Sequence, residues 1–160
     1  MLLLTSTVLS LSMMLAPSAP PTQVSTAASS HVIFVCEHGA AKSLVAASYF
    51  NKFAAERGLP DRAIFRGANP QEALSVKAVA GLKEDGVPIP DVKPTTLGDE
   101  EVKRSTHIFA IGCALPKAAA ASGKAADWSD VPDDQGYAPM RDAIVKHVRA
   151  LLDEIQRVKK

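Results

Sequence analysis

Hydrophobic residues from position 31 onward follow two alternating spacings, which predict alternating strands and helices. Residues 31–35 form a short apolar run rich in β-branched side chains and end at a glycine-containing loop, as a buried strand does. Residues 43–57 carry apolar side chains at helical spacing, and Gly58 follows where a helix commonly ends. The same reasoning predicts strands at 63–65 and 107–112, a helix at 74–85, and a short fourth strand near Trp128.

The last segment is the clearest helix of the sequence. Pro139 fits its first turn, and its apolar stripe comprises Ile144, Val148, Leu151, Leu152 and Ile155. Three prolines at positions 88, 90 and 94 keep the stretch after the second helix out of regular structure. Alternating strands and helices favour a parallel sheet that is covered on both faces. The expected fold class is therefore α/β, a three-layer sandwich around a central four-stranded parallel sheet.

The N-terminal segment differs from the rest, since no Asp, Glu, Lys or Arg occurs before Glu37. Residues 2–16 are mostly apolar and residues 17–30 are rich in Pro, Ser, Thr and Ala, a pattern that resembles a secretory signal cleaved after Ala27. The apolar run is too short and too polar to span a membrane. We expect a signal peptide or a disordered extension at residues 1–30 and one domain at residues 31–160. A signal implies export to the periplasm or the medium, and the alternative is a cytoplasmic protein.

Composition and net charge indicate which kinds of molecule the protein is expected to bind. The 160 residues carry a net charge of +1, with 47% hydrophobic and 22% charged residues, which is typical of one globular domain. The sequence has neither a strong net charge nor a basic patch interleaved with aromatic residues, so nucleic acid is not an expected partner.

The segment between the first strand and the first helix holds the candidate chemistry. Cys36 stands at the carboxyl end of the strand, where the first N–H groups of the following helix lack partners and the helix dipole attracts an anion. A curled loop brings the Lys42 ammonium back over the same cavity, and the Ser43 hydroxyl can reach the sulfur. Helix N-termini and cations favour the thiolate form of a cysteine. The expected anion-binding residues are Glu37, His38, Gly39, Ala40, Ala41 and Lys42.

The sequence Cys36-Glu-His-Gly-Ala-Ala-Lys42-Ser43 is similar to the Cys-x5-Arg-Ser/Thr loop of the low-molecular-weight protein tyrosine phosphatases. It equally resembles the loop of the thioredoxin-coupled arsenate reductases that share their fold. Residues 65–69 resemble the turn after the family's second strand, and the likeness extends from about residue 31 to the C-terminus. The resemblance implies a phosphatase of phosphoproteins, on phosphotyrosine, or of small phosphate esters. In such an enzyme Cys36 forms a cysteinyl-phosphate intermediate, without a metal or an organic cofactor.

The resemblance also implies roles for the neighbours of Cys36. Lys42 and the loop amides would bind the oxyanion, and Ser43 would stabilise the thiolate. Lys42 replaces the family's arginine, which grips phosphate with two parallel N–H bonds, whereas lysine is a point charge. Glu37 adds a carboxylate beside the nucleophile, and Gly39 replaces an asparagine that braces the family's loop.

The general acid of the family is an aspartate directly before a proline. Here one residue separates Asp130 from Pro132, and Asp133 follows immediately. A phosphatase needs such an acid to protonate the leaving oxygen. Asp130 is the first candidate for this acid and Asp133 is the second, and the alternative interpretation is an ordinary acidic surface loop.

Cys113 ends the third predicted strand. In the resemblance it matches the cysteine with which the arsenate reductases attack the first thiol, but residues 114–124 lack the third cysteine of their relay. The alternatives are an oxyanion reductase that uses Cys36 and Cys113 with electrons from thioredoxin or a small thiol, or a buried packing thiol. An oxidising compartment would favour a disulfide between the two. A further hypothesis is a non-catalytic anion-binding or interaction module.

The remaining candidates carry weaker signals. Trp128 and Tyr137 are candidates for the wall of an aromatic substrate pocket, although Trp128 equally suits a plug over the sheet's edge. His38 has no second ligand at metal spacing, so no metal site is expected.

Overall fold

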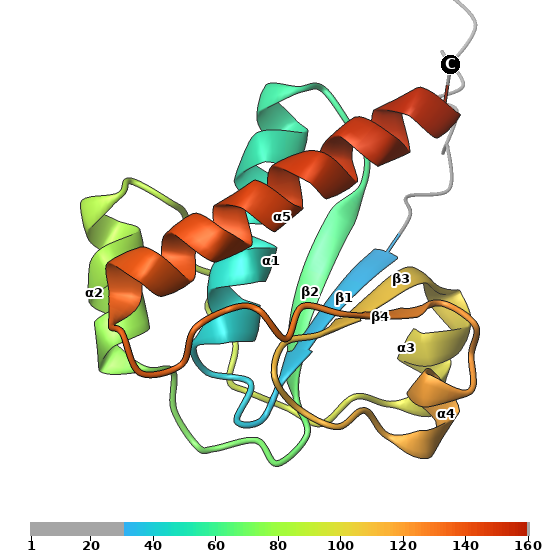
Figure 1. Cartoon of the computed structure of the whole chain (residues 1–160), viewed down its shortest axis with the longest axis horizontal. Helices are drawn as coiled ribbons and strands as arrows, with labels where there is room; N and C mark the ends of the chain where they lie inside the picture. Colours follow the sequence, from blue (N-terminus) through green and yellow to red (C-terminus); the bar gives the residue numbers. More distant parts are fainter. Residues whose placement is uncertain (1–30, 160) are drawn as a thin grey trace, which may run out of the picture.

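Four parallel strands form the central sheet of the computed structural model, which describes residues 31–159. The order across the sheet is β2-β1-β3-β4, so the first strand lies inside the sheet (Figure 1). The strands are β1 His31–Cys36, β2 Arg62–Gly67, β3 Ser105–Ala110 and β4 Ala125–Asp127. Phe34 of β1 lies opposite Phe65 of β2 and Phe109 of β3. The predicted fold class and the parallel four-stranded sheet are therefore confirmed.

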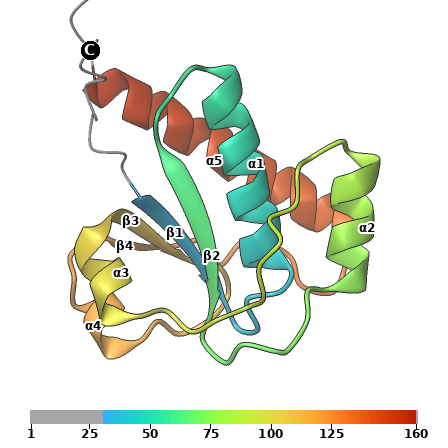
Figure 2. The same ribbon diagram turned by 180° about the vertical axis from the view of Figure 1, so that it is seen from behind.

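Helices cover both faces of this sheet, which gives the predicted three layers. They are α1 Lys42–Glu56, α2 Val76–Glu84, α3 Asp99–Arg104, α4 Lys117–Ala120 and α5 Tyr137–Val158. Figures 1 and 2 show α1 and α5 on one face, with α2 beside them, and the short α3 and α4 on the other. The signal predicted for residues 1–30 lies outside the described residues. No described helix is long and apolar enough to cross a membrane.

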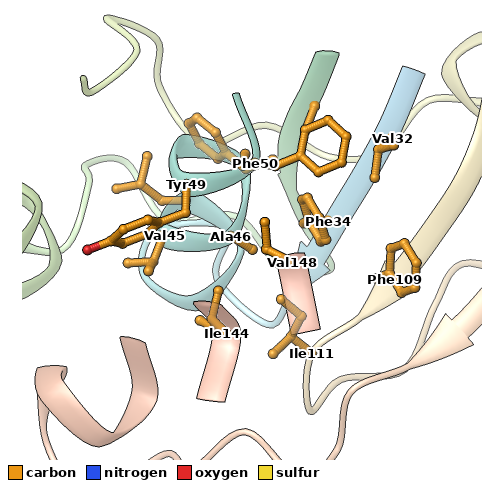
Figure 3. Close-up of a cluster of buried hydrophobic side chains, with 14 of the residues drawn as sticks. Val32, Phe34, Val45, Ala46, Tyr49, Phe50, Phe109, Ile111, Ile144 and Val148 are labelled. Atoms are coloured by element: carbon orange, nitrogen blue, oxygen red, sulfur yellow. The ribbon is translucent and has the colours of Figure 1, made fainter. Parts of the chain in front are cut away.

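Strand β1 is buried on both sides, and its residues alternate between two cores. Val32, Phe34 and Cys36 face the large cluster with α1 and α5, whereas Ile33 and Val35 face a smaller cluster under α3 and α4. A strand with two buried faces needs apolar residues at successive positions, which explains the uninterrupted run of the sequence. Figure 3 shows the large cluster, with Phe34 directed from β1 towards α1 and α5.

Aromatic packing fixes the centre of the large cluster. The Phe34 ring lies 5.5 Å from the Phe109 ring and 5.2 Å from the Trp128 ring, measured between centroids. Burying a phenylalanine completely contributes about 1.5–3 kcal/mol. Trp128 is buried here, so the interpretation of Trp128 as a plug at the sheet is supported by its contacts.

The elements depart from the sequence expectations at a few places. The strand predicted at 107–112 lies at Ser105–Ala110, and α3 was not predicted. Its first turn holds three acidic residues, and the Glu101 carboxylate accepts a hydrogen bond from the Gly98 N–H. The Gly98 and Glu101 spacing is typical of a helix start, but the prolines at positions 88, 90 and 94 led to the expectation of an irregular segment here. Because all four strands run parallel, the loops that follow them meet at one edge, and Cys36 lies there.

Candidate functional site

The loop between β1 and α1 turns its carbonyl groups outward. The carbonyls of residues 36, 37, 38 and 40 accept hydrogen bonds from the backbone N–H groups of Ala68, Asn69, Gln71 and Ser75, at 2.7–3.2 Å. A trans peptide points the next residue's N–H away from each carbonyl. The N–H groups of residues 37, 38, 39 and 41 therefore point to the inside of the loop. This arrangement is a nest of donors suited to an oxyanion.

Gly39 allows the loop to lie directly on the segment after β2. Its φ of +63° lies in the left-handed region, and a Cβ atom there would stand 2.7 Å from the Gly67 nitrogen. The Gly67 N–H in turn donates to the Thr95 carbonyl at 2.9 Å, so the two loops and the segment before α3 form one backbone network.

Cys36 lies beneath this nest, where α1 begins. Its residue is 3% exposed, and its Sγ lies 3.1 Å from the hydroxyl oxygen of Ser43, which is fully buried. The Ser43 hydroxyl can donate to the sulfur in its anionic form, as predicted. No side chain caps the N-terminus of α1, and no acidic residue lies in its first turn. The helix dipole and the free N–H groups therefore face any anion bound in the loop.

A cavity of about 420 Å³ opens above Cys36. Its wall combines the loop with the segments that follow β2, β3 and β4, namely Cys36, Glu37, His38, Ala40, Ala41, Lys42, Gln71, Ser75, Gly112, Asp133 and Met140. Sequence reasoning named the loop residues and Asp133. It missed Gln71, Ser75, Gly112 and Met140, although the rule that parallel strands end at one edge would have directed attention to the segments containing Gln71 and Gly112.

Lys42 reaches across the cavity wall to Asp133. The Lys42 Nζ lies 2.5 Å from an Asp133 carboxylate oxygen, and the lysine is 8% exposed. The Asp133 side chain is 73% exposed. The predicted return of the ammonium to the cavity is therefore present, and its partner is the second of the two acid candidates.

Asp130, the first candidate for the acid, lies elsewhere. Its carboxylate oxygens lie 2.8 and 3.0 Å from the His147 Nε2 on α5, and the His147 ring stacks on Trp128. Asp130 does not line the cavity above Cys36. The structure thus separates two aspartates that are three positions apart in the sequence.

Glu37 and His38 are exposed at the rim of the cavity. The Asn69 side-chain amide donates to the Glu37 carboxylate at 2.5 Å, and the His38 Nδ1 lies 3.3 Å from the Asn69 carbonyl. Asn69 therefore holds both loop residues from the segment after β2. This contact holds the Glu37 carboxylate against Asn69 at the rim of the cavity.

Cys113 follows the end of β3 and belongs to a different cluster from Cys36. It packs against the smaller cluster under α3 and α4, and its Sγ contacts the Val35 carbonyl at 3.5 Å. Burial raises the pKa of the Cys113 thiol to about 11. Both thiols are free.

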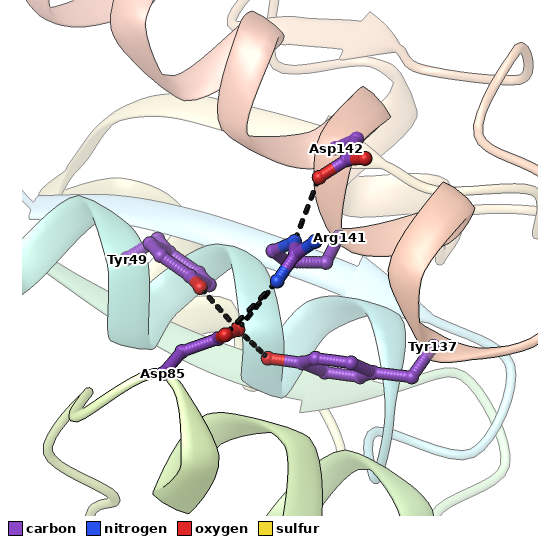
Figure 4. A network of polar contacts seen from close by, with 5 residues as sticks. All are labelled: Tyr49, Asp85, Tyr137, Arg141 and Asp142. Atoms are coloured by element: carbon purple, nitrogen blue, oxygen red, sulfur yellow. Dashed lines mark hydrogen bonds and ion pairs between the residues drawn. The ribbon is translucent and has the colours of Figure 1, made fainter.

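A separate cluster ties the helices beside the cavity together. The Asp85 carboxylate at the end of α2 accepts hydrogen bonds from Tyr49 of α1 at 2.6 Å and from Tyr137 of α5 at 2.8 Å. Arg141 donates to both its oxygens at 2.9 and 3.0 Å (Figure 4). The Tyr49 hydrogen bond is the largest cause that lowers the pKa of Asp85. Tyr137 also lines a hollow of about 340 Å³ that shares Asp133 and Met140 with the cavity.

The described residues contain no group of three or more His, Cys, Asp or Glu side chains that could hold a metal ion.

Comparison with known proteins supports the fold. No known family model matches the chain, and no curated protein matches it by sequence. YfkJ from Bacillus subtilis matches with a TM-score of 0.74 and 17% identity, over 82% of this chain and 98% of that one. A thioredoxin-dependent arsenate reductase from Corynebacterium glutamicum matches with a TM-score of 0.69 and 23% identity, over 83% and 65%. A low-molecular-weight protein tyrosine phosphatase from T. tengcongensis matches with a TM-score of 0.67 and 21% identity, over 79% and 99%.

The chain therefore has the fold that these phosphatases and reductases share, as the sequence resemblance predicted.

Proposed function

We propose that the chain is a phosphate-ester hydrolase that forms a cysteinyl-phosphate intermediate on Cys36. The orientation of the loop carries this proposal. Its carbonyls at residues 36, 37, 38 and 40 are all engaged on the outside, so its N–H groups converge on the inside. Preorganised donors of this kind stabilise the charge that builds up on phosphoryl oxygens.

In the first step the Cys36 sulfur attacks the phosphorus atom, and the bond to the ester oxygen breaks. The loop N–H groups and the Lys42 ammonium hold the other phosphoryl oxygens. Asp133, displaced from Lys42 by the phosphoryl group, takes up the proton that the Cys36 thiol loses and gives it to the leaving oxygen. Asp133 is assigned this role because it lines the cavity, whereas Asp130 is paired with His147 outside it.

In the second step water attacks the phosphorus atom and the sulfur leaves as a thiolate. Asp133, now a carboxylate, accepts the proton of that water. The Ser43 hydroxyl, 3.1 Å from the sulfur, stabilises the thiolate as it leaves. Phosphate departs with the atoms of the water molecule, and the enzyme returns to its starting state.

The wall of the cavity favours small phosphate esters over phosphotyrosyl side chains. No Phe, Tyr or Trp lies among the residues that line it, and Trp128 is buried in the core. A phosphotyrosyl ring gains affinity from aromatic neighbours, and the aromatic residue next to this wall is Tyr137 in the adjoining hollow, whose hydroxyl is already bonded to Asp85. Polar groups such as Gln71 and Ser75 suit a small polar leaving group instead.

An arsenate reductase that uses Cys36 and Cys113 receives less support. The second thiol of such a relay must attack the first, and thiolate is the attacking form. Cys113 packs against the smaller cluster and does not line the cavity above Cys36, and its raised pKa keeps it protonated at neutral pH. The reductase named among the structural matches is thioredoxin-dependent, so thioredoxin is the electron donor to test.

Hydrolysis of p-nitrophenyl phosphate tests the proposal. We expect Cys36→Ser to abolish turnover and Cys113→Ser to leave it nearly unchanged. Rapid quenching of the wild type with a labelled substrate should trap phosphate on the protein, and the Cys36→Ala variant, which has no side-chain nucleophile at this position, should trap none. Hydrolysis that survives in Cys36→Ser contradicts the mechanism. Arsenate reduction by thioredoxin that requires Cys113 would instead support the reductase, and phosphate binding without turnover would support a binding module.

A further inference from the structure

Lys42 carries an ammonium group that is almost buried and has an incomplete set of partners. The residue is 8% exposed, and among residues 31–159 its one ion-pair partner is Asp133. A protonated lysine has three N–H donors, and buried donors are normally paired. Two donors therefore remain for oxygens that enter the cavity.

Gly112 borders the space that this ammonium occupies. A Cβ atom at position 112 would lie 2.7 Å from the Lys42 Nζ and 3.7 Å from an Asp133 carboxylate oxygen. The nearest atom is thus the end of a flexible side chain, which can move away without disturbing the backbone. The φ of Gly112 is +65°, a region that other residues adopt with strain.

We propose that Gly112 is a positioning residue for Lys42. Its missing side chain leaves the place where the ammonium sits, and Asp133 holds the ammonium there until an oxyanion oxygen replaces the carboxylate. The role assigned to the oxyanion rests on the proposed function, whereas the placement of the ammonium by Gly112 does not.

The same contacts explain how a lysine can bind an oxyanion at the position where the family has an arginine. The ammonium is a single compact charge, and it fits between the Gly112 backbone and the Asp133 carboxylate. Any side chain at position 112 would force the ammonium out of the cavity wall while the loop N–H groups stayed in place. Substitution of Gly112 therefore removes one binding group selectively.

Gly112→Ala and Gly123→Ala form a matched pair. Gly123 has a φ of +70°, and a Cβ there would meet nothing within 4 Å, so its substitution imposes similar backbone strain without displacing a side chain. We expect Gly112→Ala to weaken binding of inorganic phosphate, measured by calorimetry, by about tenfold or more, the loss typical of one hydrogen bond to a charged group. Gly123→Ala should change the phosphate affinity less than about twofold.

A second measurement follows Lys42 itself and needs no bound anion. The protein is treated with an amine-acetylating reagent, and the modification rate at each lysine is read by mass spectrometry, with Lys52 as the reference. We expect Lys42 to be protected in the wild type and in Gly123→Ala, and to react several-fold faster in Gly112→Ala.

Equal protection of Lys42 in both glycine variants would overturn the inference, as would equal phosphate affinity in both. If the wild type binds no phosphate, the proposed function fails, but the labelling result still decides whether Gly112 positions Lys42. If the wild type hydrolyses phosphate esters but Lys42 is acetylated at the same rate in the wild type and in both glycine variants, the proposed function stands and the role of Gly112 is refuted.

Discussion

Two charged clusters lie close to the cavity and differ in how completely their hydrogen-bonding groups are paired. Asp85 accepts hydrogen bonds from Tyr49, Tyr137 and Arg141, which come from two helices. Lys42 has Asp133 as its one ion-pair partner within residues 31–159, and the Asp133 carboxylate is mostly exposed. The first cluster is complete without a ligand, whereas the second has donors to spare.

The difference assigns the clusters separate tasks. A buried polar group with all its partners rigidifies the structure, and one with missing partners costs free energy unless something else supplies them. The Asp85 cluster joins α1, α2 and α5, and so it should govern stability. The Lys42 cluster should govern anion binding and turnover. Variants in each cluster test whether one cluster controls stability and the other controls anion binding.

Among the variants of the two clusters, Asp133→Asn should have the largest effect on turnover. We expect kcat for p-nitrophenyl phosphate to fall by about 10²–10⁴, the range for loss of a general acid. The affinity for inorganic phosphate should rise, because the carboxylate that competes for the Lys42 ammonium has lost its charge. Steady-state kinetics and calorimetry measure the two effects separately.

Asp130→Asn is the matched control for Asp133→Asn. It removes the same charge from the same loop but touches His147 instead of the cavity. Its kcat should stay within about twofold of the wild type, because surface changes away from the site have small effects. A larger loss in Asp130→Asn than in Asp133→Asn would show that the acid was assigned to the wrong residue.

Asp85→Asn should affect stability and leave chemistry nearly intact. The free energy of unfolding should fall by about 2 kcal/mol, since hydrogen bonds to a charged group contribute about 1.5–3 kcal/mol each and the amide retains some of them. Urea denaturation followed by circular dichroism measures the loss. The kcat of the folded variant should match the wild type at a temperature below its transition.

Glu100→Gln gives the reference for an exposed ion pair. Its partner Lys103 lies three residues away on the surface of α3, and both side chains are 70% exposed. Such pairs contribute about 0–1 kcal/mol, so this variant should unfold almost as the wild type does. If the Asp85 and Glu100 variants lost equal stability, the Asp85 cluster would be no more than a surface feature.

The sequence predicted the Cys36 loop well because its determinants are local. A strand that ends at Cys36, a glycine at 39 and a helix start at Lys42 fix the path of the backbone without distant information. The choice between Asp130 and Asp133 could not be made in the same way. It depends on where β4 ends and on which residue meets His147 of α5, and both are set by tertiary packing.

The role of Gly112 also depends on tertiary packing and could not be predicted from the sequence. The sequence marks it as a glycine after a strand, which has many explanations. Its contact with the Lys42 ammonium appears only when β1 and β3 lie side by side. The sequence therefore predicts which backbone forms the cradle, and packing decides which side chains complete it.

Acid pH should weaken the Asp85 cluster in a defined direction. The pKa of Asp85 is lowered from its ordinary value of 3.8, first by the Tyr49 hydrogen bond and also by Tyr137 and Arg141. The stabilisation it gives is present above pH 3.8 and is lost as the pH falls through the lower pKa of the folded state. In urea denaturation at a series of acid pH values, the free energy of unfolding of Asp85→Asn should depend less on pH than that of the wild type. A smaller loss should remain, because Arg66 lowers the pKa of Glu101 as well.

Cys113 tests whether a side chain with few hydrogen-bond partners is always a functional group. Its thiol has a single long contact to the Val35 carbonyl, yet it lies against the smaller core and not on the cavity. Because burial raises its pKa to about 11, the folded protein keeps the thiol neutral where an unfolded cysteine ionises, above about pH 9. Stability should therefore fall as the pH rises from about 9 to 11, and Cys113→Ser should reduce that slope. The part above about pH 10 should remain, because burial raises the pKa values of Tyr49 and Tyr137 above their ordinary 10.0.

At neutral pH the effect of Cys113→Ser on stability and on turnover should be small. We expect less than about 1 kcal/mol in stability and an unchanged kcat, because a small polarity change at a half-buried site creates no cavity. Alkylation by iodoacetamide should modify Cys113 slowly below pH 9 and faster above it, since the thiolate is the reacting form. Rapid alkylation at pH 7, or a large loss of kcat, would mean that Cys113 reaches the cavity in solution. Missing partners would then mark a reactive group outside the cavity as well, whereas the proposed function uses only the cavity that Cys36 and Lys42 line.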